Sequence, residues 1–419
     1  MHSTLENTEK IKTKIIEHRR HLHRKPELSF KEFETCKYIC EVLAKLNIPY
    51  EVVCNTGVVA KIGNVTNVTN VTNVSNSNIS NSNVTSNANI VSNAENVNCI
   101  AFRADIDALP ITENTSLSYS SENKGVMHAC GHDMHVAMLL GAAEILKANE
   151  KNLNGIVKLI FQPAEESLPG GAKAMIANGV LENPKPQMIF AQHINPAENA
   201  GTFSVSKTAT MAATCEIYWT IKGKGTHAAQ PHLGSDTILV ATNIISLVQS
   251  LMTKYRNPLE QAILSVCSIN GGNANNIFPD EVRMSGTLRT FDENSRDYYL
   301  ELLADKCQQL AKVYDTDCIV DVVKGYPAVI NNEGVVEIFQ NVVEGLFGSE
   351  NFSICEPKMI AEDFAYFALE VPACFYFIGA KDTDFGEYFP LHSPKFNPSE
   401  SVLTKGSALI VELAMNILK

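Results

Sequence analysis

Apolar positions recur along the chain with two periods, and their alternation predicts an α/β protein. Continuous apolar runs typical of buried strands cover residues 58–62, 99–103, 157–161, 188–192 and 374–379. Helical spacing of three and four residues covers 136–148, 171–178, 333–347 and a closing segment from about residue 399. Strands that alternate with helices build a sheet covered by helices. We therefore predict an α/β domain made from both ends of the chain.

A different order of elements occupies the middle of the chain. Strands are predicted over 215–221, 262–269, 281–291 and 318–323, and helices over 236–255 and 293–314. That order, βαββαβ, is typical of a ferredoxin-like domain. The α/β pattern resumes after residue 325, so we predict a smaller domain inserted into a larger one. The predicted parts are 1–206, the inserted 207–324, and 325–419.

The amino-terminal part predicts two helices and then a polar tract. One helix is predicted over residues 8–23 and the next from Ser29, where Ser29 and Glu32 have the spacing of a capping box and Leu28 and Phe33 that of a hydrophobic staple. Residues 64–98 consist largely of Asn-Val-Thr and Asn-Ser repeats. Such a tract cannot bury enough apolar surface to offset its ordering entropy. We expect a disordered loop inserted between two strands.

Composition narrows the function. At 419 residues the chain is too long for one ordinary core, and its 45% hydrophobic content is ample for two. The formal charge of −12 provides no basic surface for nucleic acid or anionic membranes. No run approaches the ~18 apolar residues that span a bilayer. Eleven cysteines without a CxxC pair argue against a disulfide framework. We expect a cytoplasmic protein.

Candidate chemistry concentrates in the run Cys130-Gly131-His132-Asp133-Met134-His135. A thiol and two imidazoles within six residues can supply ligands to one metal centre. Glu165 and Glu166 follow the apolar run 157–161, His193 follows 188–192, and His392 comes after the strand predicted at 374–379. Cys, Glu and His at the ends of four strands predict one convergent metal site.

These donors are too numerous for one catalytic zinc ion that must also hold a water molecule. Two ions about 3.5 to 4 Å apart, sharing one bridging ligand, use them economically. Cys130 is the candidate bridge, since a thiolate can bind two ions. Side chains alternate in an extended segment, so one of Glu165 and Glu166 is expected to bind an ion and the other to transfer protons. Zinc, manganese, cobalt and nickel all remain open as the metal.

One further histidine lies in the predicted inserted domain. His227 belongs to the segment Gly223-Lys224-Gly225-Thr226-His227, just after a predicted strand, where the glycines favour an exposed turn. From such a turn it could donate a hydrogen bond to the oxyanion that develops on a substrate carbonyl.

Taken together, these motifs resemble the di-metal amidohydrolases that include aminoacylases, hippurate hydrolases and indole-acetyl-amino-acid hydrolases. The resemblance covers nearly the whole chain except residues 64–98. It is carried, in order, by residues 19–23 (RRHLH), 102–110 (FRADIDALP), 127–135 (MHACGHDMH), 162–166 (QPAEE), 223–232 (GKGTHAAQPH), 276–279 (NIFP), 361–364 (AEDF) and 391–394 (LHSP). Their order and spacing together are highly specific.

The resemblance implies a zinc-peptidase-like catalytic domain with an inserted ferredoxin-like lid. It makes Glu165 the general base and implies five metal ligands: Cys130, His132, Glu166, His193 and His392. His227 is implied to stabilise the oxyanion, and Asn276 and Arg289 to hold the substrate carboxylate or oxyanion. Aspartates 105, 107 and 133 and His135 are expected to support the ligands. The lid usually forms a dimer interface too, so we expect a homodimer or higher oligomer and an action of His227 in a partner's site.

The implied reaction is hydrolysis of the amide bond of an N-acyl amino acid or related small acylamino compound. An alternative within the resemblance is deacetylation of N-acetyl-diaminopimelate in lysine synthesis. Two alternatives come from other classes. In one, Cys130 is a nucleophile paired with His132 or His135. In the other, the chain is a non-catalytic metal-binding scaffold with the Asn-rich tract as its interaction surface.

Overall fold

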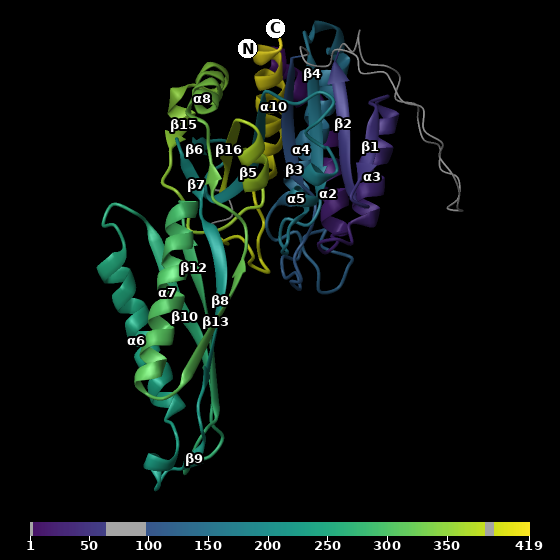
Figure 1. Cartoon of the computed structure of the whole chain (residues 1–419). Coiled ribbons are helices and arrows are strands. Elements are labelled where there is room, and N and C mark those ends of the chain that lie inside the picture. Colours follow the sequence, from purple (N-terminus) through teal and green to yellow (C-terminus); the bar gives the residue numbers. More distant parts are fainter. Residues whose placement is uncertain (1–2, 64–97, 382–388) are drawn as a thin grey trace, which may run out of the picture. The chain divides into compact units, whose positions relative to one another are not determined.

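The computed structural model describes residues 3–63, 98–381 and 389–419, which form two compact units (Figure 1). Unit 1 consists of Met1–Thr208, Asn331–Cys355 and Phe367–Lys419. Unit 2 consists of Ala209–Ile330 and Glu356–Tyr366. The Asn-rich loop predicted at 64–98 falls, apart from Asn98, outside the described residues.

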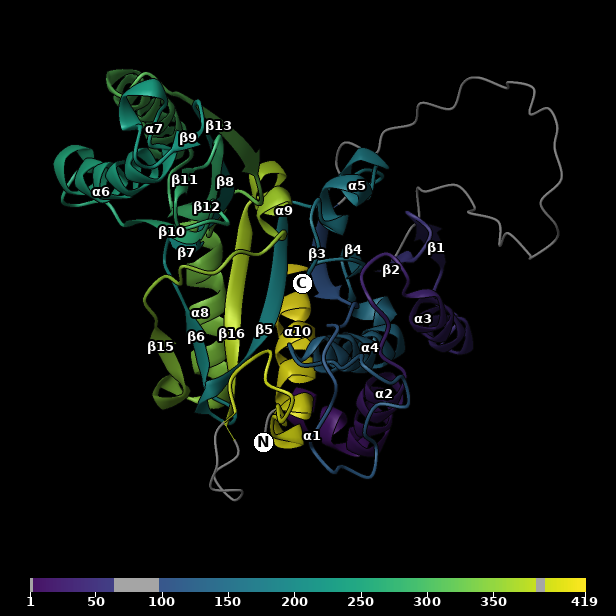
Figure 2. The same ribbon diagram turned by 90° about the horizontal axis from the view of Figure 1, so that it is seen from below.

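A mixed sheet of eight described strands forms the centre of unit 1 (Figure 2). Its order is β1-β2-β4-β3-β5-β16-β6-β15, with β4, β3, β5 and β16 as parallel neighbours. The carboxyl ends of parallel strands share one edge, where open α/β sheets bind ligands. The strands are β1 (Tyr50–Val53), β2 (Gly57–Gly63), β3 (Cys99–Asp105), β4 (Ile156–Gln162), β5 (Met188–Asn199), β6 (Phe203–Val205), β15 (Phe352–Ile354) and β16 (Ala373–Lys381).

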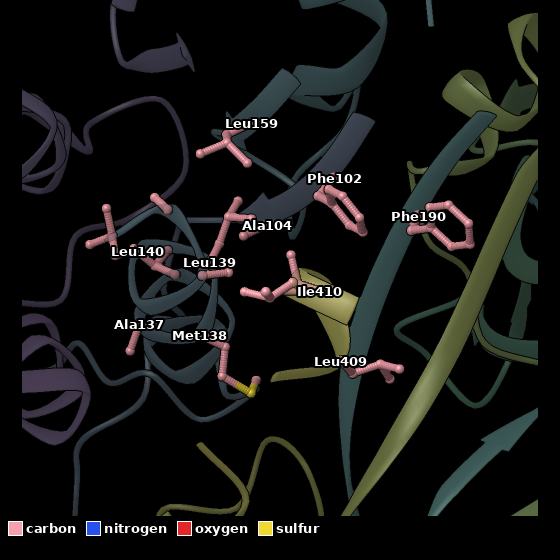
Figure 3. Packing of buried hydrophobic residues seen from close by; sticks show 14 of the residues in the cluster. Phe102, Ala104, Ala137, Met138, Leu139, Leu140, Leu159, Phe190, Leu409 and Ile410 are labelled. Carbon is pink, nitrogen blue, oxygen red and sulfur yellow. The ribbon is translucent and has the colours of Figure 1, made fainter. Parts of the chain in front are cut away.

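Helices cover this sheet and close a single core around α4. In α4 (His132–Ala148), apolar side chains lie on every side of the helix, as expected for a central buried helix. Figure 3 shows Leu139 of α4, Ile410 of α10 and Phe102 of β3 within one cluster of buried side chains, all at most 2% exposed. The other helices of unit 1 are α1 (Ser3–Lys10), α2 (Lys12–Arg24), α3 (Phe33–Lys45), α5 (Gly171–Ala177), α8 (Glu333–Phe347) and α10 (Leu403–Ile417), while α9 (Ala365–Glu370) spans the boundary between units.

The amino-terminal helices differ from the prediction. The helix predicted over 8–23 is two helices, α1 and α2, and α3 begins at Phe33, not at Ser29. The capping box is wrong because the Ser29 hydroxyl donates to Asp107 Oδ2 (2.7 Å). The carboxylate of Glu27 instead accepts the free N–H groups of residues 34 and 35 (3.2 and 2.8 Å). The staple is also wrong, since Phe33 is 58% exposed. Long-range partners outweigh the local signal here.

Unit 2 contains the elements in the order βαββαβ. Its antiparallel sheet has the strand order β10-β12-β8-β13, and both long helices pack against the face that carries Trp219. Asp236 and Asp292 cap these helices by accepting the N–H groups of residues 239 and 295. The elements are β8 (Ala213–Lys222), α6 (Thr237–Tyr255), β10 (Ala262–Asn270), β12 (Glu281–Thr290), α7 (Glu293–Val313) and β13 (Asp317–Lys324). The predicted boundaries at 207 and 324 stay a prediction.

Helix α6 is long and apolar enough, by length and composition, to cross a membrane, and within the described residues no other helix is. Its buried side chains follow one stripe, which includes Val240, Ile244 and Val248. That stripe packs into the same core as Trp219 of β8. The apolar character of α6 is therefore explained by its place in the core of unit 2.

Candidate metal centre

The turn before α4 brings the thiol and the first imidazole of the site together. Cys130 precedes Gly131, which has a left-handed φ of 93°, and His132 is the first residue of α4. The backbone conformation favours glycine, and a Cβ on Gly131 would also crowd the Ile194 side chain at 3.2 Å. The turn lies at the carboxyl edge of the parallel strands because α4 follows β3 and contacts it.

Two groups of three possible ligands meet at this edge, and they share Cys130. In each group, the possible ligand atoms all lie within 4.8 Å of one another. The Cys130 Sγ lies 3.4 Å from His193 Nε2 in the group completed by His132. In the other group, His392 Nε2 lies 3.4 Å from Glu166 Oε1. The structure thus brings together all five residues that the sequence predicted as ligands.

Orphaned polar atoms at the centre test whether these residues fit a cation. His132 Nε2 and Glu166 Oε1 are buried, 3.9 Å apart, and neither has a hydrogen-bond partner among the described residues. The other ring nitrogen of His132 lies 2.9 Å from the Asp107 carbonyl oxygen, to which it donates. That bond directs Nε2 to the centre of the site, as in metal sites where a second hydrogen bond fixes the ligand tautomer. The donor set of sulfur, nitrogen and oxygen fits zinc or a similar divalent ion.

The electrostatics of the site also favour a cation. Burial opposes charge on His132, but the carboxylates of Asp105, Asp107 and Glu166 outweigh it and raise the pKa of His132 to about 10. Burial lowers the pKa of His193 to about 3, so its Nε2 carries no proton and its lone pair can bind a metal ion. Nδ1 of His193 donates to the Ile194 carbonyl oxygen at 2.8 Å. The carboxylates that raise the pKa of His132 would also stabilise a metal cation at this position.

The environment of Cys130 disfavours the thiol-nucleophile alternative. Burial, together with the carboxylates of Glu166 and Glu165, raises the pKa of the Cys130 thiol well above its ordinary value. A nucleophilic cysteine needs the opposite, a pKa lowered by positive neighbours. A bound cation would reverse this effect, because coordination deprotonates a thiol.

The carboxylates of Glu165 and Glu166 lie closer together than the alternation of side chains along an extended segment predicts. Strand β4 ends at Gln162, and residues 165–167 form a bend after Ala164, whose φ is 54°. Glu165, Glu166 and His132 form a further group whose possible ligand atoms lie within 4.8 Å of one another. The expectation that strand alternation separates the two side chains is therefore wrong, because the segment is no longer extended.

The bend is held by a residue whose role the sequence did not reveal. The Glu32 carboxylate, which is 0% exposed, accepts the Ala164 N–H (2.8 Å) and the Thr56 hydroxyl (2.9 Å). The Glu166 N–H donates to Asp107 Oδ2 at 3.0 Å. No local pattern distinguishes Glu32 from a helix-capping glutamate: it also accepts the nearby Phe30 N–H, and Thr56 and Ala164 lie far away in sequence.

In unit 2, the structure places His227 beside Asn276. Strand β9 (Thr226–His227) pairs with β11 (Ile277–Phe278), and the Ala228 N–H donates to the Asn276 carbonyl oxygen at 2.9 Å. The exposed His227 ring accepts the Ala229 N–H at Nδ1 (3.1 Å). In its neutral form, its proton is therefore on Nε2, which is a hydrogen-bond donor.

Arg289 lies elsewhere in the same unit. It is in β12, eight residues beyond Glu281, and it pairs with Thr214 at the start of β8. The opposite end of β12, at Glu281, is the end near β9, because the neighbouring Asp280 carbonyl oxygen accepts the N–H of Gly223, just before β9, at 2.8 Å. At about 3.3 Å per residue, Arg289 is roughly 26 Å along the sheet from that end. The structure therefore does not bring Arg289 to His227 and Asn276.

Comparison with known proteins places this geometry in a family. The N-acetyl-L-cysteine deacetylase of Bacillus subtilis is 35% identical over 98% of this chain and 90% of its own length. Thermostable carboxypeptidase 1 of Saccharolobus solfataricus is 35% identical, over 96% and 94%. IAA-amino acid hydrolase ILR1-like 5 of Arabidopsis thaliana is 34% identical, over 96% and 86%.

A solved structure and a family model extend this result. The B. subtilis YXEP protein, described as a dinuclear metal-binding peptidase from the M20 family, is 31% identical, with a TM-score of 0.80 over 98% of this chain and 99% of its own. Residues 101–416 match the model of peptidase family M20/M25/M40. This match includes the turn before α4, the bend at residues 165–167, His193 and His392. The chain therefore belongs to peptidase family M20/M25/M40.

Proposed function

We propose that this chain hydrolyses the amide bond of N-acylated amino acids at a centre of two divalent ions. As a member of its family it is a metal-dependent hydrolase of amide or peptide bonds. The observation that carries the proposal is the pair of donor groups that share Cys130. The names of the relatives support the substrate class, because N-acetyl-cysteine and indole-acetyl amino acids both contain an amide nitrogen that belongs to an amino acid.

In this proposal, five side chains hold the ions. Cys130, His132 and His193 supply sulfur and two nitrogens to one ion, and Cys130, Glu166 and His392 supply the ligands of the other. The shared thiolate lowers the repulsion between two cations that lie close together. When bound, the ions polarise the substrate carbonyl and lower the pKa of water. The identity of the metal among zinc, manganese, cobalt and nickel is part of the test below.

Proton transfer is assigned to Glu165. Its carboxylate lies in the same group as His132 and Glu166, and the side chain is 7% exposed. It would accept the proton of the attacking water and then donate it to the leaving nitrogen, giving a carboxylic acid and a free amine. Burial keeps bulk water from competing for that proton.

We assign oxyanion stabilisation to His227, through its Nε2–H, with Asn276 beside it. The resemblance adds Arg289 as a group for the substrate carboxylate. Arg289 lies roughly 26 Å along β12 from Glu281, whereas His227 lies in the separate β9–β11 sheet near the Glu281 end, so one copy of unit 2 does not present both to a small substrate. Two copies could. We therefore propose a homodimer in which His227 acts in the partner's site. The exposed Ile263, Ile319 and Val323 on the edge strands support an interface in this unit.

Mixing two inactive variants tests the partner arrangement. We expect His227→Ala and Glu165→Gln each to lose activity alone and to regain part of it when they are mixed, unfolded and refolded together. A hybrid dimer would then contain one complete site, with wild-type Glu165 from one chain and wild-type His227 from the other. Turnover by the mixture is compared with that of each variant refolded alone. No recovery, with hybrid dimers verified by tag-based purification, would show that His227 acts within its own chain.

Metal content and amine release together test the proposed function. We expect about two divalent ions per chain and hydrolysis of at least one substrate in a panel of N-acetyl, N-benzoyl and N-indole-acetyl amino acids. Activity should disappear with a chelator and return on addition of zinc, manganese, cobalt or nickel, which also ranks the metals. N-acetyl-diaminopimelate belongs in the panel, and exclusive activity on it would select that alternative.

The same experiment separates the remaining alternatives. Activity that survives complete metal removal would point to Cys130 as a nucleophile. Full metal occupancy without hydrolysis of any acylamino compound would instead indicate a scaffold. We also propose a cytoplasmic location, which the eleven cysteines, all free thiols, support through the reducing conditions there.

A further inference from the structure

A buried histidine next to the metal centre makes two hydrogen bonds that the reaction does not use. His135 lies in α4, three residues after His132, and is 0% exposed. Its Nε2 accepts the Ile194 N–H at 2.9 Å. Its Nδ1 lies 2.6 Å from Asp105 Oδ1. Because Nε2 is an acceptor, the ring proton is on Nδ1 and is donated to Asp105, so both nitrogens are occupied.

These bonds exclude His135 as a metal ligand, although its position is close to a possible site. Asp105, His132 and His135 form a group with possible ligand atoms within 4.8 Å of one another. However, a cation there would displace a hydrogen bond of His135. It would also face the guanidinium of Arg103, whose Nη1 lies 2.6 Å from Asp105 Oδ2. Repulsion from that fixed positive charge opposes a cation at Asp105.

The hydrogen bond to Ile194 replaces a missing strand contact. Strand β5 pairs with β3 only as far as Ala191, whereas β5 itself continues through His193 and Ile194. Ile194 is 1% exposed, and its N–H donates to the side chain of His135. A buried N–H without an acceptor loses its hydrogen bond to water with nothing in exchange, which destabilises the fold. His135 thus provides a hydrogen-bond acceptor for the N–H of Ile194, in the part of β5 that no longer pairs with β3.

Ile194 is also bonded to the neighbouring metal-site histidine. Its carbonyl oxygen accepts from His193 Nδ1 at 2.8 Å, and His193 Nε2 lies 3.4 Å from Cys130 Sγ. The rings of His135 and His193 are in contact, with centroids 4.8 Å apart. Hydrogen bonds therefore link Asp105 to His135 and His135 to the Ile194 N–H, and the backbone of Ile194 connects this N–H to the carbonyl that accepts from the His193 ring.

We propose that His135 is a positioning residue that fixes His193 for metal binding through the N–H of Ile194. The inference rests on the proposed function, in which His193 binds one of the two ions. If the Ile194 N–H loses its acceptor, the backbone of residue 194 is held less firmly, and with it the next peptide, whose carbonyl orients the His193 ring. Losing a residue that orients a ligand typically weakens metal affinity about 10- to 100-fold. The ion held by Glu166 and His392 should be much less affected, because the hydrogen bonds of His135 in the described structure go to Asp105 and Ile194.

Two conservative substitutions separate the two hydrogen bonds of His135. In His135→Gln, the amide lies near the position of Nε2 and can still accept the Ile194 N–H. In His135→Asn, the amide lies near the position of Nδ1 and can still donate to Asp105, but the Ile194 N–H loses its acceptor. We expect the Asn variant to bind one of its two ions about 10- to 100-fold more weakly and the Gln variant to stay much closer to wild type.

The measurement is a titration of metal-free protein with zinc or cobalt in competition with a chelator, so that no activity is needed. Thermal unfolding of each metal-free variant provides the stability control. Lys158→Met is the matched control substitution. It removes a fully buried charge of β4 whose Nζ donates, within the described structure, to backbone carbonyls of residues 180, 182 and 184. It should lower stability and leave both metal affinities unchanged.

The remaining outcomes of this experiment would each contradict either the role of His135 or the proposed function. Equal weakening in the Gln and Asn variants would overturn the route through Ile194. Equal weakening of both ions, in proportion to lost stability as in Lys158→Met, would reduce His135 to a general structural role. If wild type binds two ions and the Asn variant binds them equally well, the inference fails while the proposed function stands. If wild type binds no ion, the proposed function itself fails.

Discussion

Glu165→Gln is expected to lower kcat by about 10²- to 10⁴-fold while both metal ions stay bound. Glutamine has nearly the same shape as glutamate, so the bend at residues 165–167 should keep its conformation. It cannot accept the proton of the attacking water, however, and the leaving nitrogen then loses its proton donor as well. The substitution removes a group that acts in the transition state, so KM should change much less than kcat.

The neighbouring residue provides the matched comparison for this prediction. Glu166→Gln makes the same chemical change one position away, at a residue that we assign to metal binding. It should lose metal affinity, and excess metal should restore part of its activity. Excess metal should not restore Glu165→Gln. Metal content, kcat and KM are measured for both variants. Turnover at the wild-type level in Glu165→Gln would remove the base role, and loss of metal from it would exchange the two assignments.

The pattern of apolar residues predicted most of the fold because the elements of this chain are strongly periodic. The α/β sheet of unit 1 and the βαββαβ order of unit 2 both follow the predicted sequence of strands and helices. The failures occur where a polar side chain has a distant partner. Ser29 and Glu32 fit a capping box locally, yet Ser29 binds Asp107 and Glu32 binds the bend at Ala164. A local sequence window contains no information on such partners.

The candidate site was predictable for a related reason. Its side chains lie in or after elements of the parallel part of the mixed sheet, so element order brings Cys130, Glu166 and His193 to the same region. What the sequence could not predict is the support beneath them. The acceptor for the Ile194 N–H is the His135 side chain, a long-range contact between α4 and β5. Nor could it predict the distance between His227 and Arg289, which depends on strand register.

Cys130→Ser should weaken the binding of both ions by at least about 100-fold, a larger effect than the 10- to 100-fold typical of residues that only orient ligands. Serine is close in size but keeps its proton at neutral pH, so it cannot supply the anion that the two donor groups share. Both groups then lose one of three donors, and two cations face each other with less negative charge between them. Activity should fall with metal content.

The cobalt-substituted protein gives the sharpest measurement of this effect. Wild type should show the sulfur-to-metal charge-transfer absorption of a bound thiolate, and Cys130→Ser should not. Cys374→Ser, at a fully buried cysteine of β16, is the control, since it should lower stability but leave this absorption and the metal content unchanged. The contrary result is a Cys130→Ser protein with two tightly bound ions and no turnover. That combination would make Cys130 a nucleophile, although burial and two adjacent carboxylates raise the pKa of its thiol.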